Sequence, residues 1–99
     1  MWILQSPGTD DAGDSAFKFR LKPGAIKTVG RATRADFIVD AALVSRLHCR
    51  LTAGDADVEV VDLKSTNGTF VNDKRVHKAT LAPGDRLRVG RVELRIARS

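Results

Sequence analysis

Three short stretches of the chain combine side chains that bind anions. They are Gly30-Arg31, Ser45-Arg46-Leu47-His48 and Ser65-Thr66-Asn67-Gly68. Arginine carries a permanent, planar positive charge that fits phosphate oxygens. Serine and threonine hydroxyls donate short hydrogen bonds, and glycine lets backbone N–H groups approach a ligand. Each stretch alone could be an ordinary polar loop, but together they indicate an anion-binding site.

The segments that must position these stretches are short and alternate apolar with polar residues. Alternation is the pattern of a strand buried on one face, and Gly, Pro, Asn or Asp separates the segments at frequent intervals. About ten short strands are expected, in an all-β sandwich or barrel whose loops gather at two ends. Residues 6–16 lack periodicity and are expected to form a loop. Most of the expected strands lie at 2–4, 17–21, 25–29, 37–39, 57–61, 70–71, 75–76, 86–89 and 92–96.

The stretch 40–54 fits two local structures. Leu43, Leu47 and Leu51 recur every four residues, as on one face of a helix. The alternative is a loop followed by a strand over 48–53. The other segments are short and alternating, and this context favours the strand.

Length, charge and cysteine content limit the possible functions. Ninety-nine residues make one domain, and 17 Lys+Arg against 12 Asp+Glu give a net charge of +5. A basic balance favours an anionic partner such as nucleic acid, phosphate or an acidic surface. The single cysteine, Cys49, excludes an intrachain disulfide and favours an intracellular protein. Because no apolar run approaches the roughly 18 residues of a membrane span, we expect a cytoplasmic protein with no membrane partner.

Other chemistries lack the residues that they require. His48, His77 and Cys49 do not have a metal-ligand spacing, and Ser45 with His48 lacks a nucleophile-elbow pattern. Cys49 lies on the inward side of its expected strand, where a small buried hydrophobic residue is the simpler interpretation. We therefore expect no enzyme, no cofactor and no metal.

The motif blocks, taken in order, match a known family. Gly30-Arg31, Ser45-Arg46-x-His48, Asp62-Leu63-x-Ser65-Thr66-Asn67-Gly68-Thr69-x-Val71-Asn72, Gly84-Asp85 and Gly90 together resemble the forkhead-associated (FHA) domain. The resemblance covers essentially the whole chain, so residues 1–99 are expected to form a single FHA-like domain. It implies a two-sheet β-sandwich of about eleven short strands. It also implies that ligand loops at one end of the sandwich bind phosphothreonine peptides.

The resemblance assigns ligand contacts to five residues. Arg31 resembles the arginine that pairs with the phosphate, and Ser45 resembles the serine that donates its hydroxyl to it. Thr66 resembles the residue of the third loop that also contacts the phosphate. Arg46 lies where members vary between Arg and Asn, and either residue can reach the phosphate. Asn67 resembles the asparagine that holds the peptide backbone beside the phosphothreonine.

The remaining motif residues resemble structural positions. Gly30, His48 and Gly68 are expected to support the loops, and His48 is expected to brace them through hydrogen bonds without touching the ligand. Asp73 departs from the family pattern, since Gly often follows the Val-Asn pair. This departure should alter only a turn.

The implied function is to bind a Thr-phosphorylated protein downstream of a Ser/Thr protein kinase. The stretch 42–44, which precedes Ser45, is uncharged. Selectivity in the family depends on this loop. We therefore expect an apolar residue to be tolerated better than an acidic one at the third position after the phosphothreonine.

Two alternatives remain open. The first is a basic nucleic-acid-binding module, in which the leucine spacing would mark a recognition helix. The chain has no Tyr, and its Phe residues fall at or beside apolar strand positions rather than among exposed basic residues, which weakens this alternative. The second is a structural or dimerisation domain that keeps the FHA fold without binding phosphate. The presence of Arg31, Ser45, Thr66 and Asn67 argues against it.

Overall fold

Eleven strands make up the described fold. The computed structural model describes residues 1–7 and 17–99, so most of the loop expected at 6–16 lies outside the described residues. Within the described part no helix is present, and none therefore has the length and apolar character that a membrane crossing requires. The strands are β1 (Trp2–Gln5), β2 (Lys18–Leu21), β3 (Ile26–Gly30), β4 (Phe37–Ile38), β5 (Cys49–Ala53), β6 (Val58–Asp62), β7 (Thr69–Val71), β8 (Lys74–Val76), β9 (Lys78–Leu81), β10 (Arg86–Val89) and β11 (Val92–Arg98).

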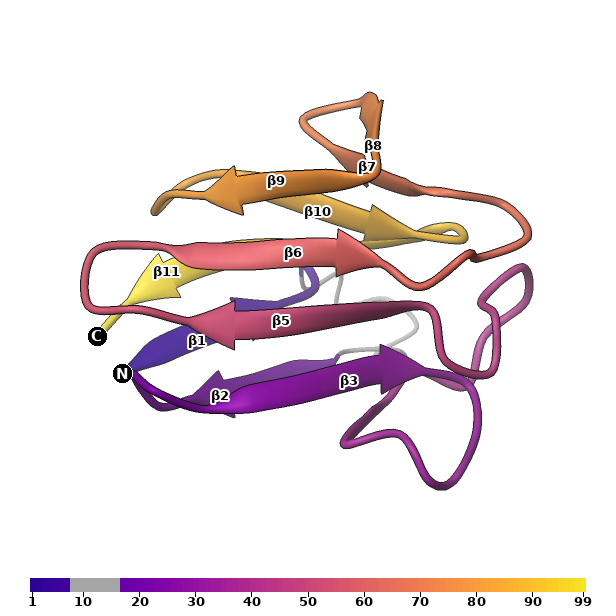
Figure 1. Ribbon diagram of the computed structural model, residues 1–99, viewed down its shortest axis with the longest axis horizontal. Helices are drawn as coiled ribbons and strands as arrows, with labels where there is room; N and C mark the ends of the chain where they lie inside the picture. Colours follow the sequence, from indigo (N-terminus) through magenta and orange to yellow (C-terminus); the bar gives the residue numbers. More distant parts are fainter. Residues whose placement is uncertain (8–16) are drawn as a thin grey trace.

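The strands form two sheets that pack face to face (Figure 1). One sheet has six strands in the order β2-β1-β11-β10-β7-β8, and the other has five in the order β4-β3-β5-β6-β9. β3 pairs with β4 in parallel, and the other described pairings are antiparallel. The two-sheet β-sandwich expected from the sequence is confirmed.

The core forms where the alternating apolar side chains of the two sheets meet. Trp2 and Leu4 of β1 are fully buried, and the Trp2 indole donates a hydrogen bond to the Gly54 carbonyl at 2.9 Å. Burying a side chain the size of Leu4 contributes on the order of 1.5–3 kcal/mol. The other residues of the core cluster are Leu21, Val29, Phe37, Val39, Val44, Cys49, Leu51, Ala53, Val58, Val60, Leu81, Leu87, Val89, Leu94 and Ile96.

The ambiguous stretch 40–54 contains a loop and a strand. β5 pairs with both β3 and β6, and its residues Cys49, Leu51 and Ala53 all point into the core. The strand expected from the sequence is confirmed, and the helix alternative is wrong. The leucine spacing misleads because Leu51 is buried in the core whereas Leu43 is exposed in the loop.

One strand, β9, was not predicted. Its four residues alternate, with Ala79 and Leu81 packed toward the core and Lys78 and Thr80 exposed. Alanine has a low strand propensity and Leu81 is the only large apolar residue of the segment, so the local signal is weak. Pairing with β6 stabilises this strand, which the local sequence alone does not predict.

The turn between β7 and β8 contains the departure from the family pattern. Asn72 and Asp73 have φ values of 50° and 70°, and Val71 pairs with Lys74 across them. Two residues with positive φ define a two-residue hairpin turn, in which Gly is favoured at the second place. Asp73 adopts this conformation and forms an ion pair with Arg86 at 3.2 Å. The departure is therefore confined to the turn.

The three anion-binding stretches lie at one end of the sandwich. β3 and β6 end there, and β5 begins there, whereas the amino and carboxyl termini lie at the opposite end (Figure 1). Adjacent strands thus bring together loops that are far apart in the sequence. The sheet topology places the candidate site on rigid strand ends.

The buried thiol of Cys49 gives a test of this packing. Burial, with a smaller contribution from the negative charge of Asp62, raises the pKa of Cys49 to about 12. At pH 8 about one thiol in ten thousand is then ionised, so the folded protein should resist iodoacetamide. Protein unfolded in guanidinium should react fully under the same conditions. Mass spectrometry measures both, and equally rapid alkylation of the folded protein would contradict the packing.

Candidate functional site

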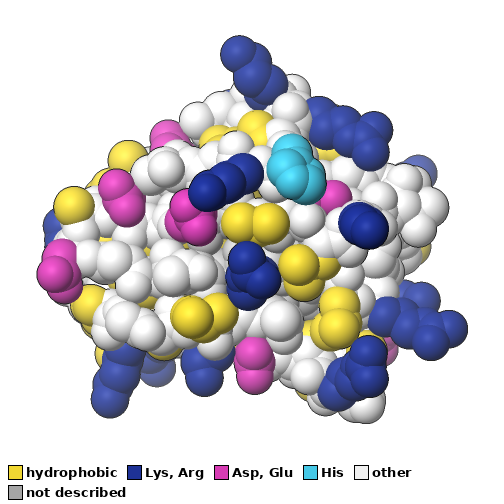
Figure 2. Space-filling view, viewed as in Figure 1, with side chains coloured by type: hydrophobic (Ala, Val, Ile, Leu, Met, Phe, Trp, Pro, Cys, Tyr) yellow, Lys and Arg dark blue, Asp and Glu magenta, His cyan; other side chains and the backbone are white. Residues whose placement is uncertain are grey.

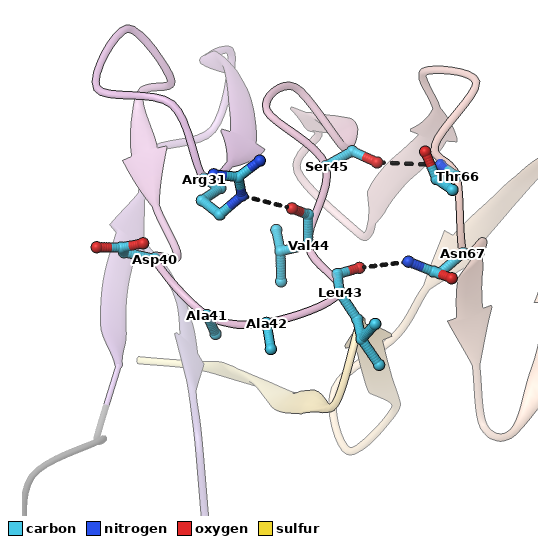
Figure 3. A pocket seen from close by; sticks show the side chains of 9 residues that line it. All are labelled: Arg31, Asp40, Ala41, Ala42, Leu43, Val44, Ser45, Thr66 and Asn67. Atoms are coloured by element: carbon cyan, nitrogen blue, oxygen red, sulfur yellow. Dashed lines mark hydrogen bonds between the residues drawn. The ribbon is translucent and has the colours of Figure 1, made fainter.

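An open pocket of about 540 Å³ lies at the loop end of the sandwich (Figure 3). Four of its lining residues are ones that the sequence analysis expected to contact a ligand. They are Arg31, Ser45, Thr66 and Asn67, which come from three different loops. The other lining residues are Asp40, Ala41, Ala42, Leu43 and Val44.

Arg31 is held at the pocket by hydrogen bonds to the loop that contains Val44 and Ser45. Its Nε donates to the Val44 carbonyl at 3.0 Å (Figure 3). Its backbone N–H donates to the Ser45 carbonyl at 2.9 Å. None of the ion pairs described in the structure involves Arg31. The two terminal nitrogens of the guanidinium therefore remain for an anionic ligand.

Ser45 and Asn67 connect the second loop, residues 39–48 between β4 and β5, with the third loop, residues 63–68 between β6 and β7. The Thr66 N–H donates to the Ser45 hydroxyl oxygen at 3.0 Å, which leaves the hydroxyl proton of Ser45 to donate elsewhere (Figure 3). The Asn67 side-chain N–H donates to the Leu43 carbonyl at 3.1 Å. Its amide oxygen can still accept a hydrogen bond.

His48 lies beneath the pocket and joins the same two loops. The residue is fully buried. Its Nδ1 accepts a hydrogen bond from the Ser45 N–H at 3.0 Å, and its Nε2 lies 2.8 Å from the Gly68 carbonyl. One ring nitrogen must accept while the other donates, which defines the neutral tautomer with its proton on Nε2. The position thus has the geometry that a bracing role requires.

Asp62 shapes the third loop. Its carboxylate accepts from the Ser65 hydroxyl at 2.5 Å, the Ser65 N–H at 3.1 Å and the Thr69 hydroxyl at 2.6 Å. The Ser65 oxygen in turn accepts from the Gly68 N–H at 2.9 Å. Burial raises the pKa of Asp62, but the hydrogen bonds from Ser65 and Thr69 outweigh it and bring the pKa below its usual value. Asp62 belongs to the family motif, but the sequence analysis gave no role to this residue.

Two glycines permit close contacts between loops. A Cβ on Gly30 would lie 1.9 Å from the Arg46 carbonyl oxygen, so any side chain there would clash with backbone. Gly68 has a φ of +93°, and a Cβ on it would lie 2.8 Å from Nε of Arg75. Gly30 therefore allows the second loop to pack on β3, and Gly68 allows the third loop to turn.

A third glycine contact was not anticipated. A Cβ on Gly90, in the turn between β10 and β11, would lie 2.9 Å from the Ala42 carbonyl oxygen and 3.0 Å from Val44 Cγ2. Gly90 thus supports the loop that forms one side of the pocket. Sequence spacing does not reveal this contact because the two segments are a loop and a turn far apart in the chain, attached to different sheets.

Arg46 is placed differently from the other expected ligand residues. Its side chain is exposed and does not line the pocket, and its carbonyl accepts from the Ala32 N–H at 3.1 Å. Its contact with a phosphate stays a prediction. Asp40, which the sequence analysis did not single out, does line the pocket. Among the described residues, no group of three or more His, Cys, Asp or Glu is placed to hold a metal ion.

Comparisons with known proteins agree with this fold. The sequence pattern of the FHA domain matches residues 27–90. The chain is 39% identical to the glycogen accumulation regulator GarA of Mycobacterium tuberculosis over 70 residues, which are 71% of this chain and 43% of GarA. It spans less than half the length of the curated relatives it matches.

Two solved FHA domains cover nearly the whole chain. One, from a structural and functional analysis of phosphothreonine-dependent FHA domain interactions, is 32% identical, with a TM-score of 0.83 over 99% of this chain and 96% of that one. The other is the FHA domain of FhaA complexed with the intracellular domain of Rv3910. It is 33% identical, with a TM-score of 0.81 over 97% of this chain and 99% of that one. The chain belongs to the FHA domain family.

Replacing His48 tests its bracing position. His48→Ala leaves the Ser45 N–H and the Gly68 carbonyl without their partner, so we expect a loss of about 2–4 kcal/mol in the free energy of unfolding. His77→Ala is the matched control, since this side chain is exposed, and it should change stability by less than about 0.5 kcal/mol. Denaturant titration measures both variants. Equal effects would show that the buried hydrogen bonds contribute nothing specific.

The lowered pKa of Asp62 predicts how its contribution depends on pH. Asp62→Asn should cost about 1–2 kcal/mol at pH 7, a figure reduced because the carboxylate is partly exposed. Since the folded-state pKa lies below the unfolded value of about 3.9, this contribution is complete above that value and is lost as the pH falls through the folded-state pKa.

The difference between wild type and Asp62→Asn should therefore shrink on acidification below about pH 4. Chemical denaturation from neutral to acid pH measures it. Asp55→Asn, at an exposed residue, serves as the control at pH 7. A difference that grows on acidification would have the wrong sign for a carboxylate that is stabilised in the folded state.

Proposed function

We propose that the chain is a phosphopeptide-binding module that recognises phosphothreonine in partner proteins phosphorylated by a Ser/Thr protein kinase. The observation that carries the proposal is the convergence of Arg31, Ser45 and Thr66 on one pocket at the loop end of an FHA fold. A phosphothreonine carries about −1.5 to −2 charges at neutral pH and has three acceptor oxygens. The pocket offers a fixed guanidinium and a hydroxyl donor to meet them.

Each pocket residue has a separate role in this proposal. The terminal nitrogens of Arg31 donate to the phosphate, and the Ser45 hydroxyl adds a second donor. Thr66 contacts the phosphate from the third loop. Arg46, at the rim, adds positive charge when its side chain turns toward the ligand. Asn67 holds the peptide backbone through its amide group.

Gly30, His48 and Gly68 act only on the shape of the site. Their contacts fix the loops before a ligand arrives, which reduces the cost of ordering them during binding. Each charge-assisted hydrogen bond contributes on the order of 1.5–3 kcal/mol. Three or four such bonds, offset by the ordering of the peptide, suggest a dissociation constant near the micromolar scale.

The proposal involves binding alone, with no bond made or broken. The chain acts in it as a single FHA domain over residues 1–99, without cofactor, and meets its partner in the cytoplasm. GarA, which the chain resembles, is a regulator by name. We rank a purely structural role below phosphothreonine binding because it does not explain why three loops present anion-binding groups to one pocket. We rank nucleic-acid binding below it because the leucines at 43, 47 and 51, which would mark a recognition helix, lie in a loop and in β5.

Arg31→Ala tests the proposed phosphate contact. We expect a labelled phosphothreonine peptide to bind saturably, and Arg31→Ala to weaken that binding by about 10- to 100-fold because a charge-assisted pair is lost. Arg34→Ala is the matched control: it removes one exposed arginine of the same loop that does not line the pocket, and should change affinity by about twofold or less. Fluorescence polarisation measures both. Undiminished binding of the dephosphorylated peptide would contradict the proposal.

The side of the pocket formed by residues 40–44 carries no positive charge, and this predicts a sequence preference. Ala41, Ala42 and the exposed Leu43 line this side together with the carboxylate of Asp40. An acidic residue at the third position after the phosphothreonine would gain no positive partner there and would meet Asp40. A phosphopeptide array should therefore favour apolar over acidic residues at that position, and a dominant Asp would contradict this reading.

A further inference from the structure

The outer face of the six-stranded sheet is strongly basic. Along its strands the inward side chains are buried, so the alternate residues face out. The charged residues among those that face out are Lys18, Arg20, Arg75, Arg86, Arg88, Glu93 and Arg95. Among the described residues, six basic side chains therefore share this surface with one acidic side chain.

The five-stranded sheet does not share this character. Its outward charged residues are Arg50, Glu59 and Lys78, and Glu59 pairs with Lys78 at 3.4 Å. Figure 2 views the molecule from the side of this sheet and shows basic, acidic and apolar side chains mixed on the surface. The excess positive charge on the two outer sheet faces is thus concentrated on the six-stranded side.

One like-charge pair on the basic face opposes stability. Arg86 lies directly opposite Arg95 on neighbouring antiparallel strands, an arrangement that destabilises a sheet. The positive charge of Arg86 is balanced by ion pairs with Asp73 at 3.2 Å and Glu93 at 3.8 Å. Arg95 is exposed and takes part in none of the ion pairs described in the structure. Arg95 therefore adds positive charge to this face without a described ion-pair partner.

We propose that this basic face is a second docking surface, which takes an acidic segment of a partner protein. Five of its six basic residues are arginines, whose planar forks bind carboxylates in two-point fashion. Neighbouring strands lie about 4.8 Å apart, so the guanidinium groups form a flat array rather than a single point charge. The surface lies on the sheet face and not in the phosphothreonine pocket, so it goes beyond the function proposed above.

The face fits an acidic protein segment better than other anions. Proteins that bind single-stranded nucleic acid on a sheet stack the bases on exposed aromatic rings. Among the described residues, Phe70 is the only aromatic residue that points outward from this sheet, and the Arg88 guanidinium covers its ring at 4.1 Å. A membrane surface would need large apolar anchors, but apart from Phe70, which Arg88 covers, the outward apolar residues described on this sheet are the half-buried Ile3 and the small Ala97.

The test uses the 99-residue chain and a labelled short peptide of alternating Asp and Glu, which has nothing to phosphorylate. Binding is measured at low salt and at about 150 mM salt. The variant Arg88→Gln/Arg95→Gln should weaken it by about fivefold or more. The matched control Arg50→Gln/Lys78→Gln removes the same charge from the other sheet and should weaken it by about twofold or less. Arg31→Ala should also have little effect, which separates this surface from the phosphothreonine pocket.

Equal losses in the two double variants would overturn the proposal, because the attraction would then be a diffuse effect of net charge. An oligothymidine or a phosphatidylserine vesicle that binds more tightly than the peptide, with loss in Arg88→Gln/Arg95→Gln, would also overturn it in favour of another partner. Arg95→Gln alone should keep or raise the Tm, because it removes the like-charge pair. A lowered Tm would show that Arg95 serves the fold instead.

Discussion

The site depends on one buried side chain, the neutral imidazole of His48. Its two ring nitrogens meet the backbone of two loops that are separated in sequence, at Ser45 and at Gly68. Its own backbone is fixed between β3 and the start of the third loop by the Val29 carbonyl and the Leu63 N–H. A buried polar ring with both nitrogens satisfied specifies one arrangement, because any shift of either loop would leave a buried group without its partner.

The ligand-facing groups are held in the same manner. Arg31 donates from Nε to the Val44 carbonyl, and in the proposed function its terminal nitrogens donate to the phosphate. Ser45 accepts a hydrogen bond from the Thr66 N–H, and its own hydroxyl proton can donate to the ligand in that proposal. Asn67 divides its amide in a similar way. Because these hydrogen bonds join the three loops within the protein itself, they shape the pocket independently of a ligand. Such preorganisation lets a small set of contacts reach useful affinity.

Much of this arrangement could be read from the sequence. Strict alternation located most strands, and the motif blocks identified four residues that meet at the pocket: Arg31, Ser45, Thr66 and Asn67. Arg46, also expected there, does not line it, and Asp40 was missed. The weak signal of β9 was missed because pairing with β6, not local propensity, defines that strand. The role of Asp62 and the contact of Gly90 with the 42–44 loop depend on where loops fold back in space. Spacing along the chain does not contain that information.

The most direct test of this account is a crystal structure of the chain with a bound phosphothreonine peptide. The phosphate should lie within hydrogen-bond distance of Arg31, Ser45 and Thr66, and Asn67 should contact the peptide backbone. The hydrogen bonds from His48 to Ser45 and Gly68 should be the same as in the free protein. A phosphate bound outside the pocket, or loops rearranged with the His48 bonds broken, would contradict the account.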